Sequence, residues 1–151
     1  MSDITFNAPG REARVPSWYW AAAAVGLAWN AYGVVQFAAS FAESEASLMS
    51  GGMTAAQAAL YAGLPAWMTL AFGTGVGAGL AGCVLLLLRR QAALPVFAVS
   101  FAGYLALFAG DLGYGVFAAI PAQLGILTVV MAVAAMLLAT AWIARRRGIL
   151  A

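Results

Sequence analysis

The sequence predicts an all-α membrane protein, an antiparallel bundle of four transmembrane helices with both termini in the cytoplasm. Three observations support this prediction. Apolar residues make up 65% of the 151 residues and charged residues 8%, against about 45–50% and about 25% in soluble domains. Four uncharged stretches are long enough to cross a bilayer, which takes about 20 residues. All basic residues lie between or beyond these stretches, on one side of the predicted membrane.

The chain opens with a polar segment, residues 1–16, which we interpret as a cytoplasmic tail. The first span follows at 18–40. A cleaved signal peptide is the alternative, because basic residues precede the span and small residues end it. The length of the span, together with Asn30 and Gln36 inside it, argues against that alternative, since secretory hydrophobic regions run about 7–15 residues.

The only sizeable loop joins the first span to the second, which runs from 65 to 88. Thr54 can cap a short helix over 55–62 that ends at Gly63, before Pro65 opens the second span. We expect this short helix to lie at the outer face of the membrane.

The third and fourth spans are predicted at 91–110 and 121–143, followed by a basic cytoplasmic tail at 144–151. The link between the second and third spans is so short that these two helices must form an antiparallel hairpin. The polar residues of the fourth span share no helical face, which predicts a lipid-exposed helix; they are Gln123, Thr128 and Thr140.

The basic residues predict the orientation of the bundle. They precede the first span, lie between the second and third, and follow the fourth; they are Arg11, Arg14, Arg89, Arg90, Arg145, Arg146 and Arg147. The other two loops carry only acids, which are Glu43, Glu45 and Asp111. By the positive-inside rule, both termini and the Arg89–Arg90 loop are cytoplasmic.

The chain contains no His and no Lys, which excludes several classes of chemistry. Without His there is no histidine-ligated haem or zinc and no Ser-His nucleophile pair, and without Lys there is no Schiff base or P-loop lysine. Cys83, the single cysteine, is interpreted as a small packing residue. We therefore predict no catalytic residue, no metal and no cofactor, and the short arginine run argues against nucleic acid as a partner.

Glycine is concentrated in the second span and on one face of the first. The glycines expected to allow close helix approach are Gly26, Gly33, Gly73, Gly75, Gly77, Gly79 and Gly82. In the second span, Gly73 and Gly77 share one face, and Gly75, Gly79 and Gly82 share the opposite one. Packing inside the bundle, an interface with a partner or a second copy, and a groove for a flat ligand or lipid remain open interpretations.

Four polar residues are candidates for ligand binding. If the first and third spans turn their polar stripes inward, Asn30, Gln36 and Tyr104 meet in the outer half of the bundle beneath Asp111. Asn30 can instead be a structural clamp between helices, because an unpaired amide in lipid costs several kcal/mol. Asp111 can instead mark where the third span leaves the membrane.

The order Trp29-Asn30-x-x-Gly33, Pro65-Ala66-Trp67, a glycine-rich second span ending in Arg89-Arg90, and Pro95 in the third span resembles a group of small bacterial four-helix membrane proteins. Members of that group are often labelled sugar transporters without a mechanism. The resemblance covers most of the chain and implies the bacterial inner membrane and the same topology. It transfers no functional site.

Three functions follow from these observations. The first is a non-catalytic accessory or structural subunit that binds a larger membrane complex, or itself, through its glycine-rich faces. The alternative is a small transporter or ligand-binding protein that uses the polar pocket. A membrane enzyme is the third, and it would depend on Asp111, Glu43 and Glu45 alone.

Overall fold

The computed structural model describes residues 15–151, so most of the predicted N-terminal tail lies outside the described residues. Within that range the chain forms seven helices and no strand. They are α1 (Ser17–Ser40), α2 (Glu45–Ser50), α3 (Ala55–Ala62), α4 (Ala66–Leu87), α5 (Ala93–Gly113), α6 (Val116–Ala119) and α7 (Pro121–Arg146). The four long helices correspond to the four predicted spans, and α3 has the predicted bounds.

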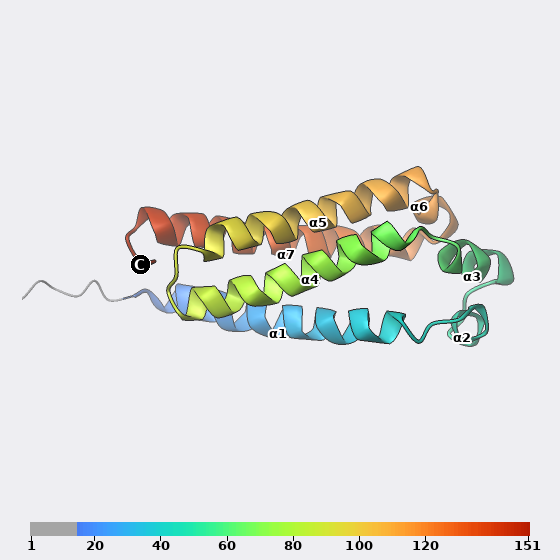
Figure 1. Ribbon diagram of the computed structural model, residues 1–151, viewed down its shortest axis with the longest axis horizontal. Helices are drawn as coiled ribbons and strands as arrows, with labels where there is room; N and C mark the ends of the chain where they lie inside the picture. The colour runs from blue at the N-terminus through green and yellow to red at the C-terminus, as the bar shows by residue number, and fades with distance from the viewer. Residues whose placement is uncertain (1–14) are drawn as a thin grey trace, which may run out of the picture.

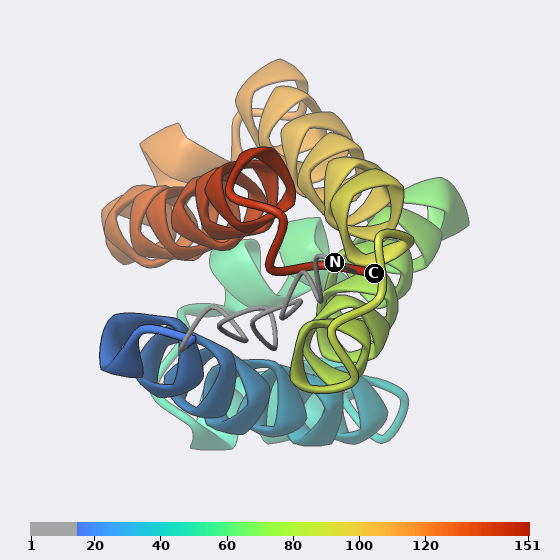
Figure 2. The same ribbon diagram turned by 90° about the vertical axis from the view of Figure 1, so that its left-hand side faces the viewer.

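The four long helices form an antiparallel bundle in which each helix has two neighbours (Figures 1 and 2). α4 packs between α1 and α5, and α7 packs between α5 and α1. Of the four neighbouring pairs, α1 and α7 make the smallest contact. The short helices α2, α3 and α6 gather at one end of the bundle (Figure 1). We call the opposite end, which carries the arginines of the described residues, the arginine end.

Local sequence explains where several helices begin. Pro65 and Pro121 stand at the starts of α4 and α7, where the missing N–H of proline costs no helical bond. The prediction that Thr54 caps α3 is confirmed, because its Oγ1 accepts from the Gln57 N–H at 3.3 Å. The Gln57 side chain in turn accepts from the Thr54 N–H at 2.9 Å, which completes a capping box.

The outer surface of the bundle is apolar. In the most hydrophobic window of each long helix, only 17–33% of the residues are buried inside the protein. Leu70 is 69% exposed and Val25 63%; in water, an apolar surface of this extent would drive aggregation. All four helices are long and apolar enough to cross a membrane, which indicates a multi-pass membrane protein.

The arginine end is closed by a segment that the sequence did not predict. α7 continues to Arg146, and Gly148, at φ +65°, turns residues 148–151 back beneath the bundle. Ile149 and Leu150 are buried there. The predicted free tail at 144–151 is therefore partly helix and partly a packed return segment.

Hydrogen bonds hold this return segment against the α4–α5 turn. The Ala151 N–H donates to the Arg89 carbonyl at 2.7 Å, and the Gln91 N–H donates to the Ala151 carbonyl at 3.1 Å. The Arg89 Nε donates to the Ile149 carbonyl at 2.9 Å. The end of the bundle is thus tied together by backbone and side-chain bonds.

Candidate functional site

A polar cluster lies near the middle of the bundle, where α1, α4 and α5 meet. It consists of Asn30, Ser100 and Tyr104, and each of these side chains is at most 3% exposed. The Asn30 Nδ2 donates to the Gly26 carbonyl at 2.8 Å and to the Cys83 Sγ at 3.7 Å. Because lipid supplies no hydrogen-bond partners, these bonds satisfy the two N–H donors of the amide inside the protein.

Glycines on α4 let the cluster form. A Cβ added to Gly79 would collide with the Asn30 Oδ1 and approach the Ser100 Oγ to 3.2 Å. A Cβ on Gly75 would lie 2.6 Å from the Tyr104 ring. Both substitutions would displace a polar side chain, so the small face of α4 determines where the cluster sits.

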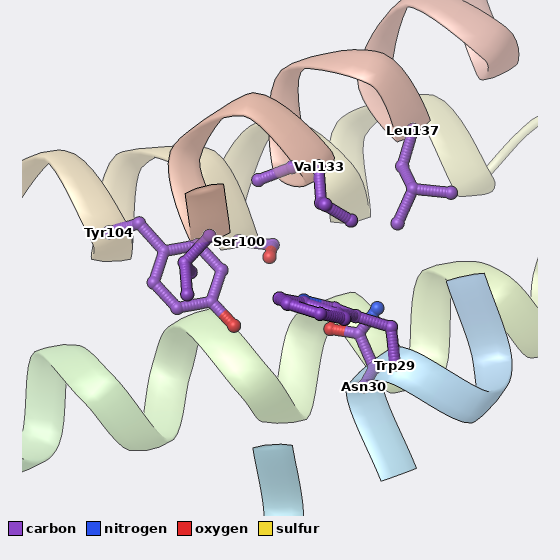
Figure 3. A pocket seen from close by; sticks show the side chains of 8 residues that line it. Trp29, Asn30, Ser100, Tyr104, Val133 and Leu137 are labelled. Carbon is purple, nitrogen blue, oxygen red and sulfur yellow. The ribbon is translucent and has the colours of Figure 1, made fainter. Parts of the chain in front are cut away.

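Ser100 and Tyr104 face the same space from α5. The Ser100 Oγ donates to the Gly75 carbonyl at 2.6 Å. The Tyr104 hydroxyl points toward Asn30 and Trp29 (Figure 3), and within residues 15–151 no hydrogen bond pairs it. In this cluster the Ser100 hydroxyl joins α5 to α4 by a hydrogen bond, and the Tyr104 hydroxyl has no partner among residues 15–151.

The pocket around the cluster is closed. Side chains from α1, α5 and α7 line it; they are Trp29, Asn30, Ser100, Tyr104, Val130, Val133, Ala134 and Leu137. They leave no void that a water molecule could occupy, although a water needs at least about 10–15 Å³. Trp29 projects into this space beside Asn30 (Figure 3).

A second polar group lies at the end of the bundle opposite the arginines. Asp111 is inside α5 and only 1% exposed, and the Gln123 Nε2 of α7 donates to its Oδ2 at 3.3 Å. Because α5 continues to Gly113, Asp111 lies within the helix, beyond the predicted end of the third span at 110. The interpretation that Asp111 marks where this helix leaves the membrane stays a prediction. The prediction that the fourth span is a lipid-exposed helix fits Thr128, which is exposed, but not Gln123, which contacts Asp111, or Thr140, which is buried.

The short helices cover this second group. The Gln57 Nε2 of α3 donates to the Ala119 carbonyl at the end of α6 at 2.7 Å, which ties the two helices together. Burial raises the pKa of the Tyr61 phenol on α3, and the negative charges of Glu43 and Asp111 raise it further. An acidic field thus extends over this end.

The four predicted ligand-binding residues do not form one pocket. Asn30 and Tyr104 meet, but Gln36 is exposed on α1. Asp111 is seven residues beyond Tyr104, which is about 10.5 Å along the helix. In the structure Asp111 contacts Gln123, which the sequence had suggested faces lipid. Both residues lie at the same end of the bundle, because Gln123 is near the start of α7 and Asp111 near the end of α5. This shared position could have predicted the contact.

The predicted glycine faces are divided between interior and surface. Six of the seven glycines would contact another helix through an added Cβ; they are Gly26, Gly33, Gly73, Gly75, Gly79 and Gly82. Gly77 alone of the seven has open space beside it. The sequence analysis missed Gly103 on α5, where an added Cβ would meet the α4 backbone at 2.9 Å.

Among residues 15–151, no group of three or more His, Cys, Asp or Glu side chains is placed to hold a metal ion. Glu43 and Glu45 are exposed at the ends of loops, while Asp111 is buried. These three carboxylates therefore differ in environment and do not share one buried site.

The fold and its interior define a four-helix, multi-pass type of membrane protein with a closed polar centre. No family model, curated protein or solved structure matches the chain. The resemblance to small bacterial four-helix membrane proteins therefore stays a prediction.

Proposed function

We propose that this chain is a non-catalytic subunit of a membrane protein complex and that the outward face of α4 binds the partner. The proposal keeps the subunit hypothesis and narrows its binding surface. The supporting observation is a row of exposed residues along α4, which we call the α4 outer stripe; it consists of Leu70, Thr74, Gly77, Ala81 and Val84.

The stripe has the spacing and the side chains of a helix-packing surface. Its members follow each other at intervals of four and three residues, so they lie on one face of the helix. The three central members are small and cover about 10 Å of helix length, between the larger Leu70 and Val84. The Thr74 hydroxyl donates to the Leu70 carbonyl at 2.8 Å, so its hydrogen-bond donor is already paired within α4.

Gly77 is the central member of the α4 outer stripe. Glycine in a helix interior costs about 1 kcal/mol relative to alanine, and no contact within the described chain offsets that cost at Gly77. A second helix would offset it, because small residues let two helix backbones approach closely and gain dispersion energy. Gly125 on α7 is open in the same way and serves as the comparison. The proposal therefore rests on the α4 outer stripe as a whole, in which Gly77 stands between Thr74 and Ala81.

The packing of the interior also favours partner binding at the surface over transport through the bundle. Transport of a solute requires a cavity or a path, and the central polar cluster is packed without a void. The unpaired Tyr104 hydroxyl is the one feature that favours the ligand-binding alternative. A ligand at that hydroxyl would have to displace side chains that fill the space around the cluster.

The proposal includes a location. The arginines of the described residues all lie at one end of the bundle, and the acids lie at the other. The positive-inside rule then places the arginine end in the cytoplasm, with both termini cytoplasmic. We propose the bacterial inner membrane, as the resemblance implies.

Substitution of Gly77 by leucine tests the proposal. The tagged full chain is extracted from its native membranes in mild detergent, and its apparent mass is compared with that of the purified chain alone. Gly125→Leu on α7 is the matched control, because Gly125 is also exposed and has open space beside it. We expect wild type and Gly125→Leu to migrate in a larger complex and Gly77→Leu to migrate alone.

Two outcomes would contradict the proposal. A wild-type chain that migrates alone from native membranes has no partner to bind. A Gly77→Leu chain that stays in the larger complex does not use the α4 outer stripe for that interaction.

A further inference from the structure

The arginine end carries a strong positive charge at its rim. Five arginines lie there, and the acids of the described residues, Glu43, Glu45 and Asp111, all lie at the opposite end (Figure 1). Arg89 is used internally, since its Nε donates to the Ile149 carbonyl. The remaining four are exposed; they are Arg90, Arg145, Arg146 and Arg147.

Two of these exposed arginines are held against tryptophan rings. The Arg146 guanidinium lies 4.1 Å from the Trp142 ring centroid, one helical turn away on α7. The Arg147 guanidinium lies 5.7 Å from the ring centroid of Trp18 on α1. The second contact joins the end of α7 to α1, whereas the first lies within α7. The two pairs are neighbours because Arg146 and Arg147 are consecutive residues.

A guanidinium group that lies over an aromatic ring keeps its N–H groups free to donate hydrogen bonds. The positive face contacts the aromatic ring, while the N–H groups at its edge point outward. Within residues 15–151, neither Arg146 nor Arg147 donates a hydrogen bond to another side chain or to the backbone through its guanidinium. These edges match the paired oxygen atoms of a phosphate, which arginine binds through two parallel hydrogen bonds.

The return segment fixes the depth of these arginines. Gly148 ends α7 directly after Arg147, and the buried Ile149 and Leu150 anchor the chain beneath the bundle. The arginines therefore remain at the rim, beside the exposed rings of Trp18 and Trp142. Tryptophan prefers the headgroup level of a bilayer, so the guanidinium groups lie at the level of lipid phosphates.

We propose that Arg146 and Arg147, together with Trp142 and Trp18, form a binding site for the phosphate of an anionic phospholipid such as phosphatidylglycerol. We call it the arginine–tryptophan site. The charge selects an anionic lipid, the guanidinium edges bind its phosphate, and the rings hold the guanidinium groups at the depth of the headgroup. The proposal is independent of the α4 outer stripe, which lies on another helix.

Lipid binding by the purified full chain tests this proposal. Native mass spectrometry from detergent micelles containing phosphatidylglycerol and phosphatidylcholine counts the bound lipids. Arg146→Gln with Arg147→Gln removes the site, and Arg90→Gln with Arg145→Gln removes the same charge from the same end. Circular dichroism verifies that both double variants remain helical.

We expect wild type to retain phosphatidylglycerol over phosphatidylcholine and the Arg90/Arg145 variant to keep most of that preference. The Arg146/Arg147 variant should lose at least about 10-fold more of the preference than the Arg90/Arg145 variant, because it also loses the charge-assisted hydrogen bonds to the phosphate. An equal loss in both variants would overturn the proposal in favour of diffuse surface charge. No preference in wild type, or displacement of the lipid by excess inorganic phosphate alone, would also overturn it.

Discussion

At Gly103 the backbone of α4 lies close to α5, which makes the stability of the bundle sensitive to a single methyl group. A Cβ at this position would lie 2.9 Å from the Ala71 carbonyl oxygen and 2.9 Å from the Gly75 nitrogen. These are backbone atoms inside a helix, so no side-chain rotation relieves the contact. Ordinary contacts begin near 3.4 Å, and Gly103→Ala therefore requires the two helices to separate by about 0.5 Å.

The free-energy cost follows from the packing of the interior. Forcing extra volume into a packed core costs about 1–3 kcal/mol, while alanine gains about 1 kcal/mol over glycine in helix propensity. Gly77→Ala on α4 receives the same gain with nothing within 4 Å of its Cβ. The difference in unfolding free energy between the two variants should therefore equal the strain alone, about 1–3 kcal/mol.

Unfolding in detergent micelles measures this difference. Increasing mole fractions of sodium dodecyl sulfate unfold the purified protein, and far-ultraviolet circular dichroism reports the loss of helix. We expect Gly103→Ala to unfold at a lower mole fraction than Gly77→Ala. Equal stability of the two variants would refute the argument that backbone contact between α4 and α5 limits the size of residue 103.

Two further predictions concern the polar groups. Ser100→Ala removes the hydrogen bond to the Gly75 carbonyl. The same unfolding titration should show that the free energy of unfolding falls by about 0.6 kcal/mol, because such interhelical bonds are weak on average. A fall of more than about 2 kcal/mol would mean that Ser100 does more than join two helices. Tyr61 should titrate above its usual pKa of 10.0, because burial and the charges of Glu43 and Asp111 raise that pKa. The folded state then holds the phenol proton more tightly than the unfolded state, so stability should fall as the pH rises above 10. Ultraviolet absorbance of wild type minus Tyr61→Phe measures this titration, Glu43→Gln should lower the pKa, and a Tyr61 that ionises at or below 10 would contradict the assignment.

The positions of the helices could be predicted from the sequence because hydropathy and turn chemistry are local properties. The four spans and the helix at Ala55–Ala62 follow from apolar length, Pro65, Pro121 and the Thr54 cap. The collection of the arginines at one end follows from where they interrupt the apolar stretches. None of these features depends on how one helix packs against another.

The candidate site was only partly predictable from the sequence. No continuous polar face shows which side of each helix points into the bundle. Each long helix is apolar nearly all round, so lipid and protein interior present similar surroundings to its side chains. The sequence therefore could not determine that Asn30 and Tyr104 point inward while Gln36 points out. It also could not assign Asp111 to Gln123, because that contact joins two helices.

What the sequence by itself determined is that this protein has four apolar helices, connected in an antiparallel order, with its arginines gathered at one end. Only the tertiary structure decided which glycines pack against another helix, which stay open, as Gly77 and Gly125 do, and how residues 148–151 close the arginine end. The physical reason is that span length and charge are set along the chain. Close packing depends instead on the shapes of two surfaces at once, and these surfaces come from segments distant in sequence.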